Sequence, residues 1–115
     1  MLNRNTLNYA IILTTVSTKE EGYVIANELV QSKLAACVNI VPKVYSIYEW
    51  ENQIQNDEEL LLLIKTTKER EKDIYHTVES LHTYDTPELI TIPIDHGSLP
   101  YLQWLENSVQ KIDKE

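Results

Sequence analysis

Residues 60–64 (LLLLI) constrain the fold of this chain more than any other feature, because this run contains no polar residue. A strand with one face in water alternates apolar and polar side chains, whereas a strand buried on both faces is continuously apolar. The run therefore predicts a strand with both faces covered. Because the helices of a 115-residue chain can cover only one face, we expect a second subunit on the other. The alternative is a central strand whose second face is partly covered by a C-terminal helix.

The segments at the start of the chain predict a strand followed by a helix. Residues 9–16 (YAIILTTV) are apolar and β-branched, which is typical of a strand. Thr18 and Glu21 then form the T-x-x-E pattern of a capping box at a helix N-terminus. Apolar residues recur at helical spacing behind it, so we expect a helix over about residues 19–32.

A long hairpin is predicted on either side of the polar turn at residues 51–53. Its first strand, residues 36–50, should bend or bulge at Pro42, because proline has no N–H for the ladder. Its second strand covers about residues 54–66. Because side chains alternate along a strand, one face beyond Pro42 collects Val44, Ser46, Tyr48 and Trp50. A small core does not cover such an aromatic outer half, and long exposed edges aggregate unless they are paired. We therefore expect assembly through the hairpins.

The C-terminal half predicts a helix, a strand and a last helix. Thr66 and Glu69 form a second capping-box pattern, and the apolar stripe behind them ends near His82. Residues 89–94 (LITIPI) predict a fourth strand, and Ser98 can cap a last helix that carries Leu102, Leu105, Val109 and Ile112. The order βαββαβ with a C-terminal helix predicts a ferredoxin-like α+β sandwich. We expect a single domain over residues 1–115, with its core at about 9–109.

Composition argues against two classes of partner. The chain has 10 basic and 18 acidic residues, a net charge of -8, whereas a nucleic-acid-binding protein presents a basic face. No apolar stretch approaches the roughly 20 residues of a membrane span, and the polar first residues do not form a signal peptide. The single cysteine, Cys37, excludes an intrachain disulfide. We therefore expect a cytoplasmic protein without nucleic-acid or membrane partners.

The sequence contains none of the motifs GxSxG, Walker A or HExxH. No neighbour of Cys37 in the sequence supplies a base, which nucleophilic catalysis needs. We therefore interpret Cys37 as a small buried apolar residue rather than a reactive thiol. Trp50 and Trp104 are interpreted as interface and core residues, because aromatic side chains are enriched where subunits meet. The chain is expected not to be an enzyme.

Several short motifs together resemble the CutA divalent-cation-tolerance family over about residues 9–109. In chain order they are residues 35–40 (AACVNI), 46–50 (SIYEW), Glu59 with 65–67 (KTT), 82–89 (HTYDTPEL), Pro93-Ile94, His96-Gly97 and 101–105 (YLQWL). The resemblance implies a ferredoxin-like protomer in a tight homotrimer, in which the long hairpins pair across subunits. The family is named for tolerance to copper and other divalent cations, and its architecture is similar to that of the nitrogen-regulatory signal-transduction trimers.

The resemblance also implies a metal contact at His82, helped by acids such as Glu59. Metal-binding members carry a cysteine where this chain has Thr14 and a further histidine where it has Leu81. Copper selects thiolate and imidazole ligands, and of that set only His82 is present. The alternative interpretation of His82 is a helix C-terminal histidine favoured by the helix dipole. The usual glycine of the hairpin turn is Asn52 here, and asparagine also tolerates the left-handed conformation.

Glu59, Lys65 and Tyr84 are the implied ligand-binding residues of a cleft shared between subunits. A glutamate and a lysine in such a cleft hold an anionic or zwitterionic ligand, or they form an interface salt bridge. The predicted function is a trimer that binds copper or another divalent cation in response to metal. The alternative is a non-enzymatic signalling or adaptor trimer that binds a small organic effector at the cleft. A trimer with a purely structural role is a third hypothesis.

Overall fold

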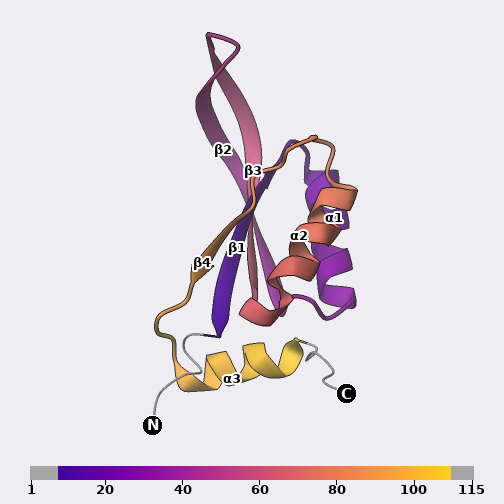
Figure 1. The fold of residues 1–115 in the computed structure, drawn as a ribbon, viewed down its shortest axis with the longest axis vertical. Coiled ribbons are helices and arrows are strands. Elements are labelled where there is room, and N and C mark those ends of the chain that lie inside the picture. The colour runs from indigo at the N-terminus through magenta and orange to yellow at the C-terminus, as the bar shows by residue number, and fades with distance from the viewer. Residues whose placement is uncertain (1–7, 110–115) are drawn as a thin grey trace.

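The computed structural model describes residues 8–109 as one α+β unit with a four-stranded antiparallel sheet (Figure 1). Its elements are β1 (Tyr9–Val16), α1 (Lys19–Gln31), β2 (Cys37–Trp50), β3 (Gln53–Thr67), the 3-10 helix η2 (Lys68–Arg70), α2 (Glu71–Leu81), β4 (Ile90–Pro93) and α3 (Leu99–Ser108). The strand order is β2-β3-β1-β4, so β1 and β3 are central. The predicted α+β class and element order are thereby confirmed, while the homotrimer stays a prediction.

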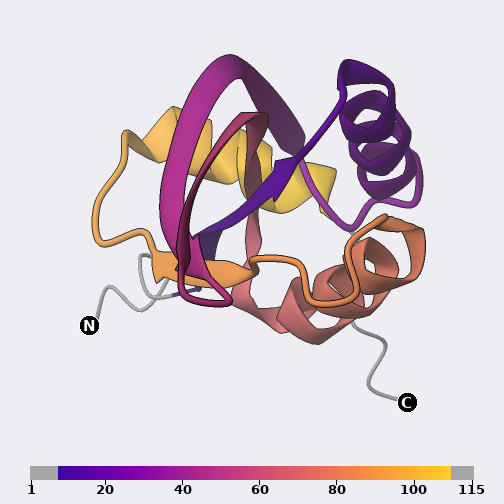
Figure 2. The same cartoon turned by 90° about the horizontal axis from the view of Figure 1, so that it is seen from above.

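The two faces of the sheet are covered differently. Helices α1 and α2 lie beside each other on one face, where Ile12, Leu62 and Ile64 form the main core with side chains from both helices (Figure 2). Helix α3 lies across the base of the sheet, at the end away from the hairpin tip. There it packs against Tyr9, which alternates with the core positions of β1 and so points to the second face. Among the described residues, no helix lies over the upper part of that second face.

The apolar run at residues 60–64 lies on the central strand β3. Leu62 and Ile64 are fully buried under the helices, whereas Leu61 and Leu63 on the other face are half-buried. Within one chain the run therefore follows the alternative interpretation, a central strand with α3 in contact at its lower end. A second subunit over Leu61 and Leu63 remains a prediction.

The bulge predicted at Pro42 is confirmed. Val41 pairs with Leu61 but Val44 pairs with Glu59, so β2 accommodates one extra residue, and Lys43 takes a positive φ of 62°. The extra residue reverses which side chains of β2 face each side. Before the bulge, odd-numbered residues of β2 share a face with Leu61; after it, even-numbered residues share a face with Glu59.

The hairpin tip is tighter than predicted, because Gln53 belongs to β3 and only two residues form the turn. Glu51 and Asn52 have φ of 52° and 65°, as a two-residue turn between twisted strands requires. Asn52 therefore adopts the left-handed conformation expected of it. The hairpin extends well beyond the helices and gives the described chain its length of 51 Å against widths of 25 and 23 Å.

The helix caps predicted from the sequence are confirmed only in part. Thr18 caps α1, because its Oγ1 accepts a hydrogen bond from the Glu21 N–H at 3.1 Å. The second predicted capping box is wrong: Thr66 is fully buried, and its hydroxyl donates to the Leu34 carbonyl at 2.7 Å. Ser98 occupies the N-cap position of α3 without a side-chain cap, and Ile112 lies outside the described residues.

Burial in the single chain bears on three further single-residue predictions, while an interface role of Trp50 and Trp104 stays a prediction. Cys37 begins β2 and is half-buried rather than buried within a strand. Trp50 is 63% exposed and Trp104 is 47% exposed, so neither is a core residue of the single chain.

Within residues 8–109, no helix is long and apolar enough to span a membrane.

Candidate functional site

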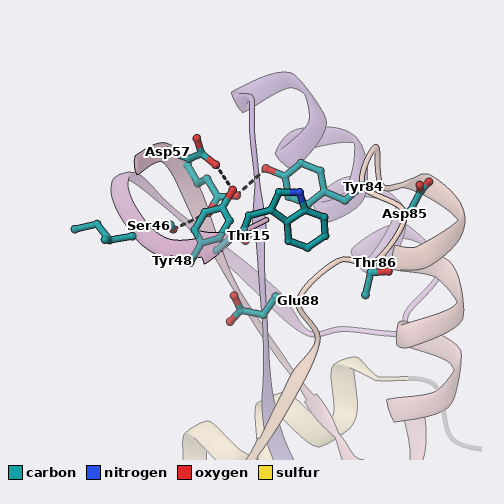
Figure 3. A pocket seen from close by; sticks show the side chains of 11 residues that line it. Thr15, Ser46, Tyr48, Asp57, Tyr84, Asp85, Thr86 and Glu88 are labelled. Atoms are coloured by element: carbon teal, nitrogen blue, oxygen red, sulfur yellow. Dashed lines mark hydrogen bonds between the residues drawn. The ribbon is translucent and has the colours of Figure 1, made fainter. Parts of the chain in front are cut away.

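A cavity of about 880 Å³ opens between the outer half of the hairpin, the end of β1 and the loop that follows α2 (Figure 3). Its lining comes from elements far apart in the sequence: Thr15 on β1, Ser46, Ile47, Tyr48 and Trp50 on β2, Asp57 and Glu59 on β3, and Tyr84, Asp85, Thr86 and Glu88 in the loop. Four of these side chains are carboxylates and none is basic. The cavity is therefore an acidic site with aromatic side chains in its walls.

The bulge at Pro42 gives this site its polar wall. Ser46 pairs with Asp57, and Tyr48 pairs with Gln55, so both β2 side chains lie on the face that also carries Glu59. Without the extra residue, the odd-numbered side chains Tyr45 and Ile47 would take that face instead. A local irregularity of one strand thus decides whether hydroxyls or apolar groups meet the carboxylates.

Glu59 is the most buried carboxylate in the cavity wall, with 7% of the residue exposed. Its Oε1 accepts a hydrogen bond from Ser46 Oγ at 2.6 Å, and its Oε2 accepts one from Tyr84 Oη at 2.7 Å. Beside it, Tyr48 Oη donates to Asp57 Oδ2 at 2.5 Å. In Figure 3, the labelled Ser46 and Tyr48 approach this cluster from the hairpin, and Tyr84 approaches it from the loop.

The surroundings of Tyr84 and Tyr48 keep both phenols protonated. Burial raises the pKa of Tyr84 well above its usual value of 10, and the hydrogen bond to Glu59 and the negative charges nearby raise it further. The hydrogen bond to Asp57 is the main cause that raises the pKa of Tyr48. Both phenols therefore serve as neutral hydrogen-bond donors at physiological pH.

His82, the predicted metal contact, is buried behind the cavity. Its side chain is 0% exposed, and Nε2 lies 2.8 Å from the Thr15 carbonyl oxygen. Nδ1 accepts a hydrogen bond from the Tyr84 N–H at 3.0 Å and lies 3.2 Å from Glu21 Oε2. Both ring nitrogens are thus engaged, so this arrangement does not fit a copper ion at His82. Within residues 8–109, no group of three or more His, Cys, Asp or Glu side chains could hold a metal ion.

Glu21 ties the start of α1 to the loop after α2. Its Oε2 accepts hydrogen bonds from the Thr83 N–H at 2.9 Å and the Thr83 hydroxyl at 3.1 Å, and its Oε1 lies 3.3 Å from the Ser17 N–H. Burial works to raise the pKa of Glu21, but the Thr83 N–H, the adjacent His82 and the other donors outweigh it and lower the pKa. Sequence reasoning gave Glu21 only a capping role, since its partner Thr83 is 62 residues away.

Lys65 does not join Glu59 and Tyr84 within one chain. It lies six positions beyond Glu59 on β3, roughly 20 Å along a strand. Its Nζ is 5.7 Å from the centroid of the Tyr101 ring on α3. Of the predicted ligand-binding residues, the structure brings together Glu59 and Tyr84, and adds Ser46, Tyr48 and Asp57 to them.

The chain matches known proteins over almost all of the described residues. Residues 10–108 match the family model described as CutA1 divalent ion tolerance protein. The "Divalent-cation tolerance protein CutA" of Thermus thermophilus is 44% identical over 98 residues, which are 85% of this chain and 95% of that protein. "Protein CutA, chloroplastic" of Arabidopsis thaliana is 48% identical over 87% of this chain, which spans only 55% of that plant relative's length.

Solved structures give the same correspondence in three dimensions. The crystal structure of CutA1 from Oryza sativa superposes with a TM-score of 0.90 at 42% identity, covering 94% of this chain and 99% of that one. The Thermus thermophilus divalent cation tolerance protein superposes with a TM-score of 0.86, also at 42% identity, over 89% of this chain and 99% of that one. The likeness therefore covers the sheet, the helices and the long hairpin together.

Proposed function

The chain belongs to the CutA1 divalent ion tolerance family, and from that premise we propose that it is a non-enzymatic homotrimer that takes up divalent cations such as copper in the cytoplasm. The observation that carries the cation role is the cavity at the hairpin base, lined by Asp57, Glu59, Asp85 and Glu88 and by no basic side chain. Convergent carboxylates raise the local concentration of cations. The proposal has the cation attracted to this acidic cavity rather than bound at His82, whose ring nitrogens are both engaged. Because no group of three or more His, Cys, Asp or Glu side chains within residues 8–109 could hold a metal ion, further ligands would come from other subunits of the trimer.

Exposed apolar side chains support the homotrimer. The open face of the sheet carries Ile90 at 48% exposure and Ile92 at 44% beside the half-buried Leu61 and Leu63. The hairpin adds further exposed apolar residues: Tyr45, Ile47, Trp50 and Ile54. Exposed apolar surface of this extent marks interaction sites. A three-fold assembly would bury both regions and would protect the long edge strand β2.

Two measurements test this proposal. Sedimentation at micromolar concentration should give three times the mass of the 13.4 kDa chain. Calorimetric titration with copper(II) and zinc should then be run on the wild type, on Asp85→Asn/Glu88→Gln and on His82→Ala. We expect weaker binding in the double variant, because its lost carboxylates line the cavity. A monomer, or metal binding lost only in His82→Ala, would contradict the proposal.

A second candidate function is an adaptor trimer that binds a small organic effector in the same cavity. The volume of the cavity, about 880 Å³, and its aromatic residues Tyr48, Trp50 and Tyr84 favour an organic ligand. Cavities of that size usually accept small molecules rather than single ions. A thermal-shift screen of metabolites checks it: an effector should raise the melting temperature of the wild type and leave that of Glu59→Gln unchanged.

A further inference from the structure

We draw no further inference here: the strongest candidate, the exposed surface patch of Tyr23, Val24 and Val30 on helix α1, carries no proposal, because nothing in the structure shows what covers it.

Discussion

Two glutamates of this protein are similarly buried in polar clusters, but only the cluster of Glu59 lines the cavity. The closed cluster consists of Glu21, His82 and Thr83, and its glutamate and histidine side chains are 8% and 0% exposed. The open cluster consists of Glu59, Ser46, Tyr48, Asp57 and the Tyr84 hydroxyl, and it lines the cavity. Glu21 accepts backbone N–H groups and lies beside a histidine, whereas Glu59 accepts only side-chain hydroxyls.

The difference separates structural polar groups from ligand-binding ones. Backbone donors are fixed by the fold, so the closed cluster holds the start of α1, the end of β1 and the loop after α2 together. Hydroxyls rotate, so the open cluster can admit another donor at little cost. Tyr84 belongs to both, because its N–H donates to His82 and its hydroxyl donates to Glu59. The closed cluster thereby positions one wall of the cavity.

The largest expected effect is that of His82→Ala. The substitution leaves the Thr15 carbonyl, the Tyr84 N–H and the Glu21 carboxylate with lost partners, and we expect a loss of about 3 kcal/mol in the free energy of unfolding. Denaturant unfolding at fixed protein concentration measures it. His76→Ala on the exposed side of α2 is the control and should change stability by less than about 0.5 kcal/mol. Equally small effects of the two substitutions would contradict a structural role for the contacts of His82.

Glu21→Gln should cost about 1–2 kcal/mol at pH 7, because charge-assisted hydrogen bonds are weakened. The pKa of Glu21 is lowered in the folded state. Its stabilising contribution is therefore present above the ordinary glutamate pKa of 4.5 and is lost as pH falls through the folded pKa. The stability difference between wild type and Glu21→Gln should thus shrink below pH 4.5, while the exposed Glu20→Gln should show little difference at any pH. A gap that widens in acid would contradict this assignment.

The parts of the fold that the sequence could predict depend on near neighbours in the chain. The bulge follows from the missing N–H of Pro42, and the cap of α1 follows from Thr18 and Glu21 three residues apart. Asp57 could also have been predicted as a site residue, because it is two positions from Glu59 and strand side chains alternate. In each case the signal lies within a few residues.

The parts that the sequence could not predict depend on packing between distant segments. Thr66 matches a capping pattern, but its burial gives it a tertiary partner, the Leu34 carbonyl. Glu21 meets Thr83 only because α1 and the loop after α2 lie at the same end of the sheet. The resemblance grouped Lys65 with Glu59, but the two residues lie six positions apart on the same strand, β3. No local pattern carries such information.

Tyr84→Phe removes one donor from the open cluster and should cost about 1 kcal/mol at neutral pH. Burial and the hydrogen bond to Glu59 raise the pKa of Tyr84, so its contribution is present below pH 10 and is lost as pH rises through the folded pKa. The stability gap to Tyr84→Phe should therefore narrow above pH 10. Tyr23→Phe on α1, where the residue is 50% exposed, is the control for general effects of a lost phenol. A stability difference between wild type and Tyr84→Phe that stays constant above pH 10 would contradict a raised pKa of Tyr84 in the folded state.

Ser46→Ala should have the smallest effect on stability, about 0.5 kcal/mol or less, although it also removes a hydrogen bond to Glu59. Glu59 keeps the Tyr84 hydroxyl, and water from the open cavity can replace the lost serine. The same variant should still alter the affinity of the cavity for a cation, because it replaces a fixed hydroxyl beside Glu59. Paired measurements of unfolding and of copper(II) or zinc binding therefore separate the two clusters. If Ser46→Ala destabilised the protein as much as His82→Ala, water would not replace the serine hydroxyl, and the distinction between an open and a closed cluster would be wrong.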